Sequence, residues 1–305
     1  MTLNLDGETR CGCECPGTSA GHGAISLGIY EKALCSTPDW DELFAQVRKA
    51  GYDFVDLSVD ESPERRARLR WPAAERRTVR DAAARQGVRL GGLCLSVHRA
   101  VGPGSADPAV QAQAAEIFRD AIWLCHDLGI PVLQVAGYYA YYEYPDDGQR
   151  ERYVATLRAA VPHAARAGVL LGLENVDGDD VTSITRAVEI CDEIGSPWLQ
   201  TYPDIGNLAE QQLDTVAELR AGQGRMLALH VKDVRVGEPR RVPLGEGIAE
   251  IPAAFAELAR QGWSGRLMVE MWNDDAPDST ATCARARRLV EQWLHEAGLE
   301  VAHTD

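Results

Sequence analysis

The sequence predicts an α/β protein of the (β/α)8 TIM barrel class, with one catalytic domain over residues 24–305. Short apolar runs rich in β-branched residues alternate with longer amphipathic segments, which is the pattern of repeated strand and helix units. Eight such units share residues 24–297, at about 34 residues each, and this matches the size of an eight-unit parallel barrel. No linker rich in proline, glycine or serine interrupts these units, which favours a single domain.

The candidate strands are the short apolar runs, each bounded by a loop and then by a helical segment. An open doubly wound sheet is the alternative fold, but it would have fewer strands, so eight units favour a closed ring. The expected strands are 24–30, 54–59, 89–96, 132–137, 169–175, 199–204, 226–232 and 265–271.

The candidate helices are the longer amphipathic segments, and many of them end just before a glycine. A glycine in this position tolerates the left-handed turn that ends a helix, so it marks where the next strand begins. The expected helices are 39–50, 72–86, 107–128, 147–167, 183–194, 210–221, 250–261 and 278–297, with stop signals at Gly51, Gly87, Gly129, Gly168, Gly195 and Gly262.

The composition excludes several classes of protein. With 45% hydrophobic and 25% charged residues, the chain is neither disordered throughout nor a collagen-like fibre. A net charge of −15 would repel a phosphate backbone, so nucleic acid is not expected as a partner. No apolar run reaches the roughly 18 residues that cross a bilayer, and no secretory signal opens the chain. We expect a cytoplasmic protein without a membrane partner, and leave open its assembly into a homo-oligomer.

Residues 1–23 are expected to form a flexible leader, because chain ends are usually poorly ordered. The leader contains Cys11, Cys13 and Cys15, but no second cluster or nearby histidine pair completes a metal site. The remaining cysteines are isolated, most of them in apolar segments, and are expected to be small buried hydrophobic residues. They are Cys35, Cys94, Cys125, Cys191 and Cys283.

Four consecutive predicted strands place one ionisable residue each at the same end: Glu174, Asp204, His230 and Glu270. Enzymes of this fold build their sites from strand ends at the C-terminal face of the barrel. A charge within a buried strand is costly unless it is paired or coordinated. Three carboxylates and one imidazole are a suitable ligand set for one divalent metal ion, namely manganese, zinc, cobalt or magnesium. The alternative is that each residue is an ordinary solvated strand end.

Other polar residues beyond the strand ends are candidates for substrate binding. Glu61 and His98 follow the second and third strands, and a structural role for His98 is weighed equally with a substrate contact. Asn207 follows Asp204 in the block TYPDIGN. Arg241 belongs to segment 235–247, whose three arginines and paired glycines make it a candidate phosphate site.

Two further features of the strand ends have a structural alternative. Lys232 and Asp233, just beyond His230, are expected to pair with each other or to support the neighbouring ligands. The aromatic run 138–142 leaves the fourth strand and is expected either to cover the substrate or to pack under a long loop.

Several blocks, read in order, resemble the sugar isomerase and epimerase group of the xylose-isomerase-like barrel superfamily. Within it, the sequence is most similar to the L-ribulose-5-phosphate 3-epimerases, also described as L-xylulose-5-phosphate 3-epimerases. The resemblance extends from about Leu27 to about Gly298. The blocks are LGIYEKAL (27–34), GYDFVDLSVDES (51–62), LCLSVHR (93–99), QVAGYYAYY (134–142), YPDIGNL (202–208), HVKD (230–233), VPLGEG (242–247) and VEMW (269–272).

This resemblance implies an isomerase that epimerises a phosphorylated L-pentulose at C3, converting L-xylulose 5-phosphate into L-ribulose 5-phosphate. The metal ligands of the family fall on Glu174, Asp204, His230 and Glu270. The leader before Ala24 departs from the pattern of the family, and Asn175 follows the first ligand where such epimerases vary.

The expected mechanism passes through an enediolate, with Glu174 and Glu270 as the two acid/base groups on opposite sides of the substrate. A hexulose-phosphate aldose–ketose isomerase and a non-phosphorylated ketose 3-epimerase are alternatives on the same metal site. A related nuclease is disfavoured by the seven histidines and the charge of −15. A sugar-phosphate-binding regulator without catalysis is the third alternative.

Overall fold

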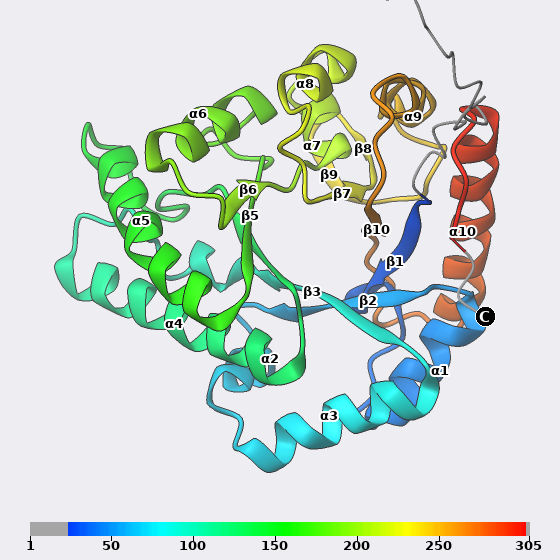
Figure 1. Cartoon of the computed structure of the whole chain (residues 1–305), viewed down its shortest axis with the longest axis horizontal. Coiled ribbons are helices and arrows are strands. Elements are labelled where there is room, and N and C mark those ends of the chain that lie inside the picture. The colour runs from blue at the N-terminus through cyan, green and yellow to red at the C-terminus, as the bar shows by residue number, and fades with distance from the viewer. Residues whose placement is uncertain (1–23, 303–305) are drawn as a thin grey trace, which may run out of the picture.

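A ring of parallel strands lies at the centre of the protein and helices surround it, as the computed structural model shows for residues 24–302 (Figure 1). The hydrogen-bonded order is β6-β5-β4-β3-β2-β1-β10-β7, so the barrel strands follow one another around the ring in chain order and the first strand, β1, pairs with the last, β10. The strands are β1 (Ser26–Tyr30), β2 (Phe54–Val59), β3 (Arg89–Leu95), β4 (Val132–Ala136), β5 (Leu170–Glu174), β6 (Leu199–Thr201), β7 (Ala228–Val231) and β10 (Arg266–Val269).

The ring closes between β6 and β7 through a few backbone contacts. Thr201 N–H donates to the Arg225 carbonyl at 2.9 Å, and His230 N–H donates to the Pro203 carbonyl at 2.8 Å. Single parallel bridges join Thr201 to Met226 and Asp204 to His230. Within residues 24–302 these contacts complete one eight-stranded barrel, which confirms the predicted fold class and single domain.

The helices fall close to the predicted segments. All six predicted stop glycines adopt positive φ, which confirms these stop signals. Five of them directly cap a helix, with φ between 64° at Gly87 and 91° at Gly51. The helices that cover the barrel are α1 (Trp40–Ala50), α3 (Ala73–Gln86), α4 (Pro108–Leu128), α5 (Gln149–Ala167), α6 (Ile184–Ile194), α8 (Thr215–Ala221), α9 (Ile251–Arg260) and α10 (Ser279–Glu296).

The predicted helix 210–221 is wrong, because two helices occupy this part of the chain. α7 (Ile205–Glu210) ends near Gln212, whose φ of 55° breaks the helical path. Asp214 then caps α8 by accepting from the Ala217 N–H at 3.0 Å. The short helix α2 (Pro63–Ala67) and the antiparallel pair β8 (Asp233–Arg235) and β9 (Glu238–Val242) were also not predicted.

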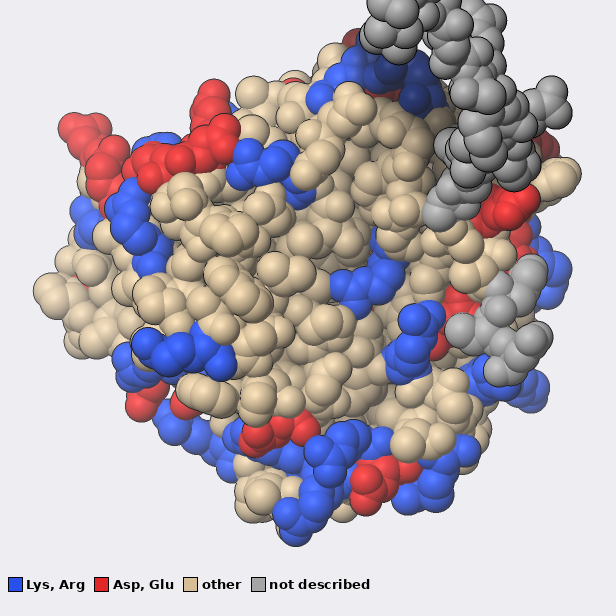
Figure 2. Space-filling view, viewed as in Figure 1, with Lys and Arg blue, Asp and Glu red and all other residues tan. Residues whose placement is uncertain are grey.

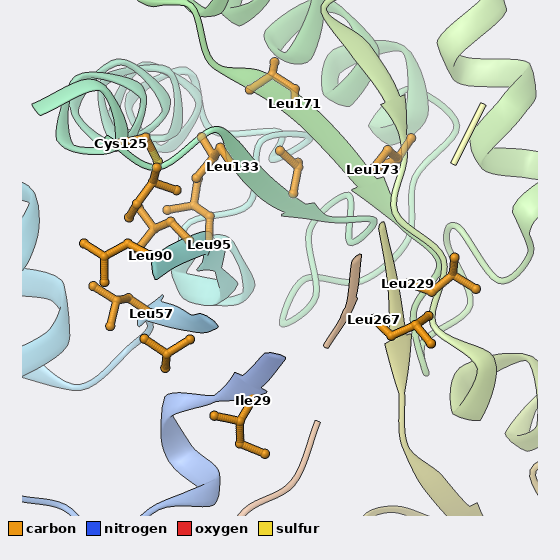
Figure 3. Packing of buried hydrophobic residues seen from close by; sticks show 14 of the residues in the cluster. Ile29, Leu57, Leu90, Leu95, Cys125, Leu133, Leu171, Leu173, Leu229 and Leu267 are labelled. Carbon is orange, nitrogen blue, oxygen red and sulfur yellow. The ribbon is translucent and has the colours of Figure 1, made fainter. Parts of the chain in front are cut away.

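Side chains alternate between two layers along each strand. The outer layer joins Ile29, Leu57, Leu133 and Leu229 to the surrounding helices in one large core, and Figure 3 shows part of this core together with Cys125 of α4. The inner layer forms separate clusters, one of which contains Tyr30, Phe54, Cys94 and Met268. Residues two positions apart therefore face the barrel interior together.

The surface carries its charge unevenly. Figure 2 shows lysine and arginine side chains gathered along the lower edge of one face, over α3, although the whole chain has a net charge of −15. Within the described residues, no helix is long and apolar enough to cross a bilayer. Four of the isolated cysteines are buried as predicted, while Cys35 is only half-buried. The predicted leader 1–23, with its three cysteines, lies outside the described residues.

Candidate active site

The ends of β5, β6, β7 and β10 bring the four predicted ligand residues together. Glu174, Asp204, His230 and Glu270 each offer a ligand atom, and these atoms all lie within 4.8 Å of one another. His230 Nδ1 is 2.7 Å from Glu174 Oε1, 3.9 Å from Asp204 Oδ2 and 4.0 Å from Glu270 Oε2. Three of the residues are buried and Glu270 is half-buried, so the cluster is largely shielded from water.

Backbone and amide groups fix the position of Asp204. The residue caps α7, where its Oδ1 accepts from the Asn207 N–H at 3.0 Å. Asn175 holds the Asp204 backbone from both sides, by accepting from its N–H at 2.9 Å and donating to its carbonyl at 3.0 Å. Asn207 in turn donates to the Asn175 carbonyl at 2.8 Å. This bracing leaves Asp204 Oδ2 directed into the cluster.

The two glutamates are held differently. Glu174 Oε2 accepts from the Gln134 side chain, whose own Oε1 accepts from the Leu95 N–H at 3.2 Å, so Glu174 is anchored through β4 to β3. Glu270 Oε2 is buried without a hydrogen bond within the described part of the chain. One glutamate is thus fixed by the barrel, while the other has a free acceptor atom.

The cluster attracts positive charge. Burial alone would lower the pKa of His230, but Glu174, Glu270 and Asp204 raise it to about 9. Burial would also lower the pKa of Lys232, but Asp204, Glu270 and Glu174 raise it above its usual value. Three carboxylates therefore exceed the positive charge that the neighbouring side chains supply.

The residues fit a single divalent cation. The donor set combines carboxylate oxygens with one imidazole, which suits manganese, magnesium, cobalt or zinc. Glu270 Oε2, which accepts no hydrogen bond from the described residues, is an acceptor that such an ion would satisfy. A second group, Asp56, Cys94 and His230, lies deeper in the barrel, but burial raises the pKa of the Cys94 thiol and so disfavours its thiolate form.

A cavity of about 180 Å³ opens beside the cluster. Glu174 and Glu270 both line it, and they come from strands that are not neighbours in the ring. Cations and aromatic rings surround the remaining space. The other lining residues are Tyr30, Lys32, Ser96, Arg99, Ala136, Tyr138, Asp177, Asn207, Lys232, Arg240 and Trp272.

The structure separates the predicted substrate-binding residues into two groups. Asn207 lines the cavity. Glu61 lies outside the lining, where it accepts from the Tyr142 hydroxyl at 3.2 Å and pairs with Arg99 at 3.5 Å. Arg241 is 57% exposed and pairs with Asp274 at 3.6 Å. The arginine of β9 that lines the cavity is its neighbour Arg240, so the substrate contact of Arg241 stays a prediction.

His98 takes the structural role that was weighed beside a substrate contact. It is fully buried, and its ring packs on Phe118 of α4 with ring centroids 4.3 Å apart. Its Nε2 lies 3.3 Å from the Ala114 carbonyl, and burial lowers the pKa of His98 to about 4. The helical turn after β3, η3 (Ser96–Arg99), directs the ring toward α4 and away from the cavity.

Lys232 and Asp233 do not pair with each other. Lys232 occupies an inner position, two residues after His230, and contacts the cluster. The Asp233 carboxylate instead accepts from four backbone N–H groups at 2.9 to 3.0 Å and so ties down the segment after β9. The donors are Val234, Gly245, Gly247 and Ala249.

The aromatic run after β4 divides between cavity and surface. Tyr138 lines the cavity and donates to Asp177, which pairs with Arg240 at 2.7 Å. Tyr142 is exposed, and its hydroxyl donates to Glu61. Arg240 was missed in the sequence, because the β8–β9 pair that brings it back over the cavity was not predicted. Asp177, three residues after Glu174, was also missed.

The fold and the site together define a barrel enzyme with an acidic centre at the C-terminal ends of its strands. The family model described as xylose isomerase-like TIM barrel matches residues 44–294. Over 275 residues the chain is 42% identical to L-ribulose-5-phosphate 3-epimerase UlaE of Salmonella paratyphi C, covering 90% of this chain and 97% of that protein. The Escherichia coli protein of the same name is 41% identical over the same shares.

Solved structures agree on the fold. An L-ribulose 3-epimerase superimposes with a TM-score of 0.76 at 21% identity, covering 90% of this chain and 96% of that one. A D-allulose 3-epimerase from Methylomonas sp. superimposes with a TM-score of 0.74 at 18% identity, covering 88% and 97%. The chain belongs to the xylose isomerase-like TIM barrel family and, within it, to the L-ribulose-5-phosphate 3-epimerases, which are epimerases of the isomerase class.

Proposed function

We propose that this protein epimerises a phosphorylated L-pentulose at C3, interconverting L-xylulose 5-phosphate and L-ribulose 5-phosphate, with one divalent metal ion at the carboxylate and histidine cluster. The observation that carries the proposal is that Glu174 of β5 and Glu270 of β10 line one cavity from strands that are not neighbours. The L-ribulose-5-phosphate 3-epimerases at 41 to 42% identity support the same reaction.

The two glutamates supply the chemistry that an inversion at C3 needs. One carboxylate removes the C3 proton, and the electrons of the C–H bond pass into an enediolate that includes the C2 carbonyl. The opposite glutamate then donates a proton to the other face of C3, so the net reaction consumes no oxidant or reductant. General acid and base groups of this kind contribute about 10²- to 10⁴-fold each.

A divalent cation held by Glu174, Asp204, His230 and Glu270 would supply Lewis-acid stabilisation of the negative charge that develops on the substrate oxygens. The residues around the ligands keep them in place. Gln134 holds Glu174, while Asn175 holds the backbone of Asp204 and the Asn207 N–H holds its Oδ1. Such fixed positions reduce the reorganisation needed during reaction.

The phosphate group is assigned to the cationic side of the cavity. Lys32, Arg99 and Arg240 line this space and carry the charge that an anionic substrate needs. Arg240 is already oriented by Asp177 at 2.7 Å. Each of these cations already pairs with one carboxylate, namely Asp60, Glu61 or Asp177. An ammonium has three N–H donors and a guanidinium has five, so donors remain for a phosphate group, which favours the phosphorylated substrate over a free sugar.

The reaction is tested in deuterated water with L-xylulose 5-phosphate, Mn²⁺ and the purified protein, followed by NMR. We expect deuterium to enter at C3 as L-ribulose 5-phosphate forms. Exchange at C1 would instead identify an aldose–ketose isomerase, and an equal rate with unphosphorylated L-ribulose would remove the phosphate requirement. Chelation should abolish exchange, and added Mn²⁺ should restore it. Full activity of the chelated protein would show that the reaction needs no metal ion.

A further inference from the structure

Lys232 is a buried cation at the centre of the site to which the proposed reaction has given no role. The residue follows β7 at an inner position and is 4% exposed. Its Nζ lies 2.7 Å from Asn207 Oδ1, 3.0 Å from Asp204 Oδ2 and 3.5 Å from Glu270 Oε2. The ammonium group also lines the cavity that both glutamates face.

The contacts of Lys232 leave one donor available. An ammonium group carries three N–H donors and no acceptor. Asn207 Oδ1 accepts one of them at 2.7 Å, and Asp204 Oδ2 forms an ion pair with the ammonium at 3.0 Å. The third faces Glu270 Oε2 across 3.5 Å, which is longer than a normal hydrogen bond, and that oxygen has no hydrogen bond among the described residues. A substrate oxygen in the cavity that Lys232 and Glu270 both line would receive this third N–H.

The space around Lys232 fits a lysine. A Cβ added at Gly206 of α7 would lie 2.6 Å from the Cγ of Lys232, so the side chain passes over α7 where no other side chain intervenes. Beyond it, the Nζ lies 5.8 Å from the ring centroid of Trp272. The lysine is therefore enclosed between a glycine and an aromatic ring, with its charge at the cavity.

Lysine is rare in the chain, and its placement also indicates a role at the cavity. Only three of its 31 basic residues are lysines: Lys32, Lys49 and Lys232. Two of these line the cavity, while Lys49 is exposed on α1. A chain that otherwise relies on arginine thus has lysine at the site, where a compact ammonium charge differs physically from a broad planar guanidinium.

We propose that Lys232 is a further catalytic residue, which donates its third N–H to the substrate oxygen that becomes negative as the C3 proton leaves. The role rests on the proposed C3 epimerisation and needs no proton transfer from the lysine. The hydrogen bond strengthens as the enediolate forms, because the donor is charged and the surroundings are shielded from water. The same ammonium keeps Asp204 directed into the cluster.

The test compares K232M with wild-type protein, both loaded with Mn²⁺, in the C3 exchange assay. We expect kcat to fall about 100-fold, as for the loss of one donor to a developing oxyanion, with KM changed little. Mn²⁺ affinity, measured by titration calorimetry, should stay the same or become tighter, because removal of the ammonium removes a repulsion from the bound ion. K232R should also lose activity, since a broad planar guanidinium does not reproduce the compact ammonium that contacts Asn207 and Asp204.

Lys49→Met is the matched control and should retain wild-type kcat and Mn²⁺ affinity. K232Q, which is also uncharged, replaces K232M if the latter does not fold. Three results would overturn the proposal: kcat within threefold of wild type, a rise in KM alone, or a loss of Mn²⁺ binding in parallel with activity. The last result would make Lys232 only a support for Asp204. Absence of C3 exchange in the wild type would instead reject the proposed function.

Discussion

Buried acidic residues occur on two sides of the barrel rim, and they are satisfied in opposite ways. After β1 and β2, Glu31 accepts from Arg65 and from Arg68, each at 2.7 Å. Asp60 on the same side pairs with Lys32 and lies 3.6 Å from Arg65. Each acid therefore meets two cations, and this side of the rim has no excess negative charge.

On the other side, three carboxylates share one lysine and one imidazole. Lys232 reaches Asp204 and Glu270, while His230 lies beside Glu174. Burial is similar on both sides, so burial of an acid does not mark the active centre by itself. The lack of counter-charge distinguishes the cluster that a cation and a substrate would complete.

The largest effect is expected from removing one acid of the cluster, where the carboxylates outnumber the neighbouring cations. Glu174→Gln or Glu270→Gln should lower epimerase turnover at least about 1,000-fold, because an amide cannot take or return the C3 proton. Circular dichroism and thermal unfolding should show an intact fold, since the substitution relieves repulsion between carboxylates. Glu296→Gln, at an exposed position, serves as the control. Substantial turnover in either site variant would refute the two-glutamate scheme.

On the side of Glu31 and Asp60, where each acid meets two cations, we expect a loss of stability and little loss of activity. Glu31→Gln should destabilise the fold by about 3 kcal/mol, because it leaves Arg65 and Arg68 without their buried partner. Turnover should stay within a few-fold of wild type, since Glu31 does not line the cavity. Urea unfolding and the exchange assay measure the two effects. A loss of activity as large as that of Glu174→Gln would erase the contrast between the two sides.

A third prediction concerns His98, which belongs to neither charge network. Its pKa is lowered to about 4 in the folded protein by burial, from about 6.5 in the unfolded chain. The unfolded state therefore binds the proton more tightly, so the contribution of neutral His98 is complete above pH 6.5 and is lost as the pH falls toward 4. The full loss amounts to about 3 kcal/mol.

Urea unfolding between pH 7 and pH 4 tests the titration of His98. His98→Phe, which keeps a ring against Phe118, should have a shallower loss of stability over this range than wild type. His295→Gln changes an exposed histidine and should follow the wild-type curve. If the free energy of unfolding fell equally with pH in His98→Phe and wild type, the titration of His98 would not be the cause of the loss of stability between pH 7 and pH 4.

The four cluster residues could be predicted because a simple rule places them. A barrel sets the C-terminal ends of its strands at one rim, and an ionisable residue at each of four such ends must meet there. Lys232 follows from the same alternation, since it stands two residues after His230, but a neighbouring Asp233 suggested a local pair. The structure shows instead that adjacent residues point to opposite sides.

The substrate side of the site could not be predicted as well. Its lining depends on segments after the strands, whose paths are fixed by tertiary contacts. The path of the β8–β9 pair places Arg240, and not Arg241, at the cavity. The backbone of Arg241 has a positive φ of 65°, which no simple sequence pattern predicts. For His98, the turn of η3 decides the direction of the ring, and position in the sequence alone leaves both directions open.

The closure of the barrel has a consequence for its mechanics. β6 has only three residues, and the joint between β6 and β7 relies on few backbone rungs, one of which connects Asp204 with His230. The side chains of these same two residues enter the cluster. A ligand bound by both side chains would therefore also link β6 to β7, so filling the centre of the site would stabilise the closure of the barrel.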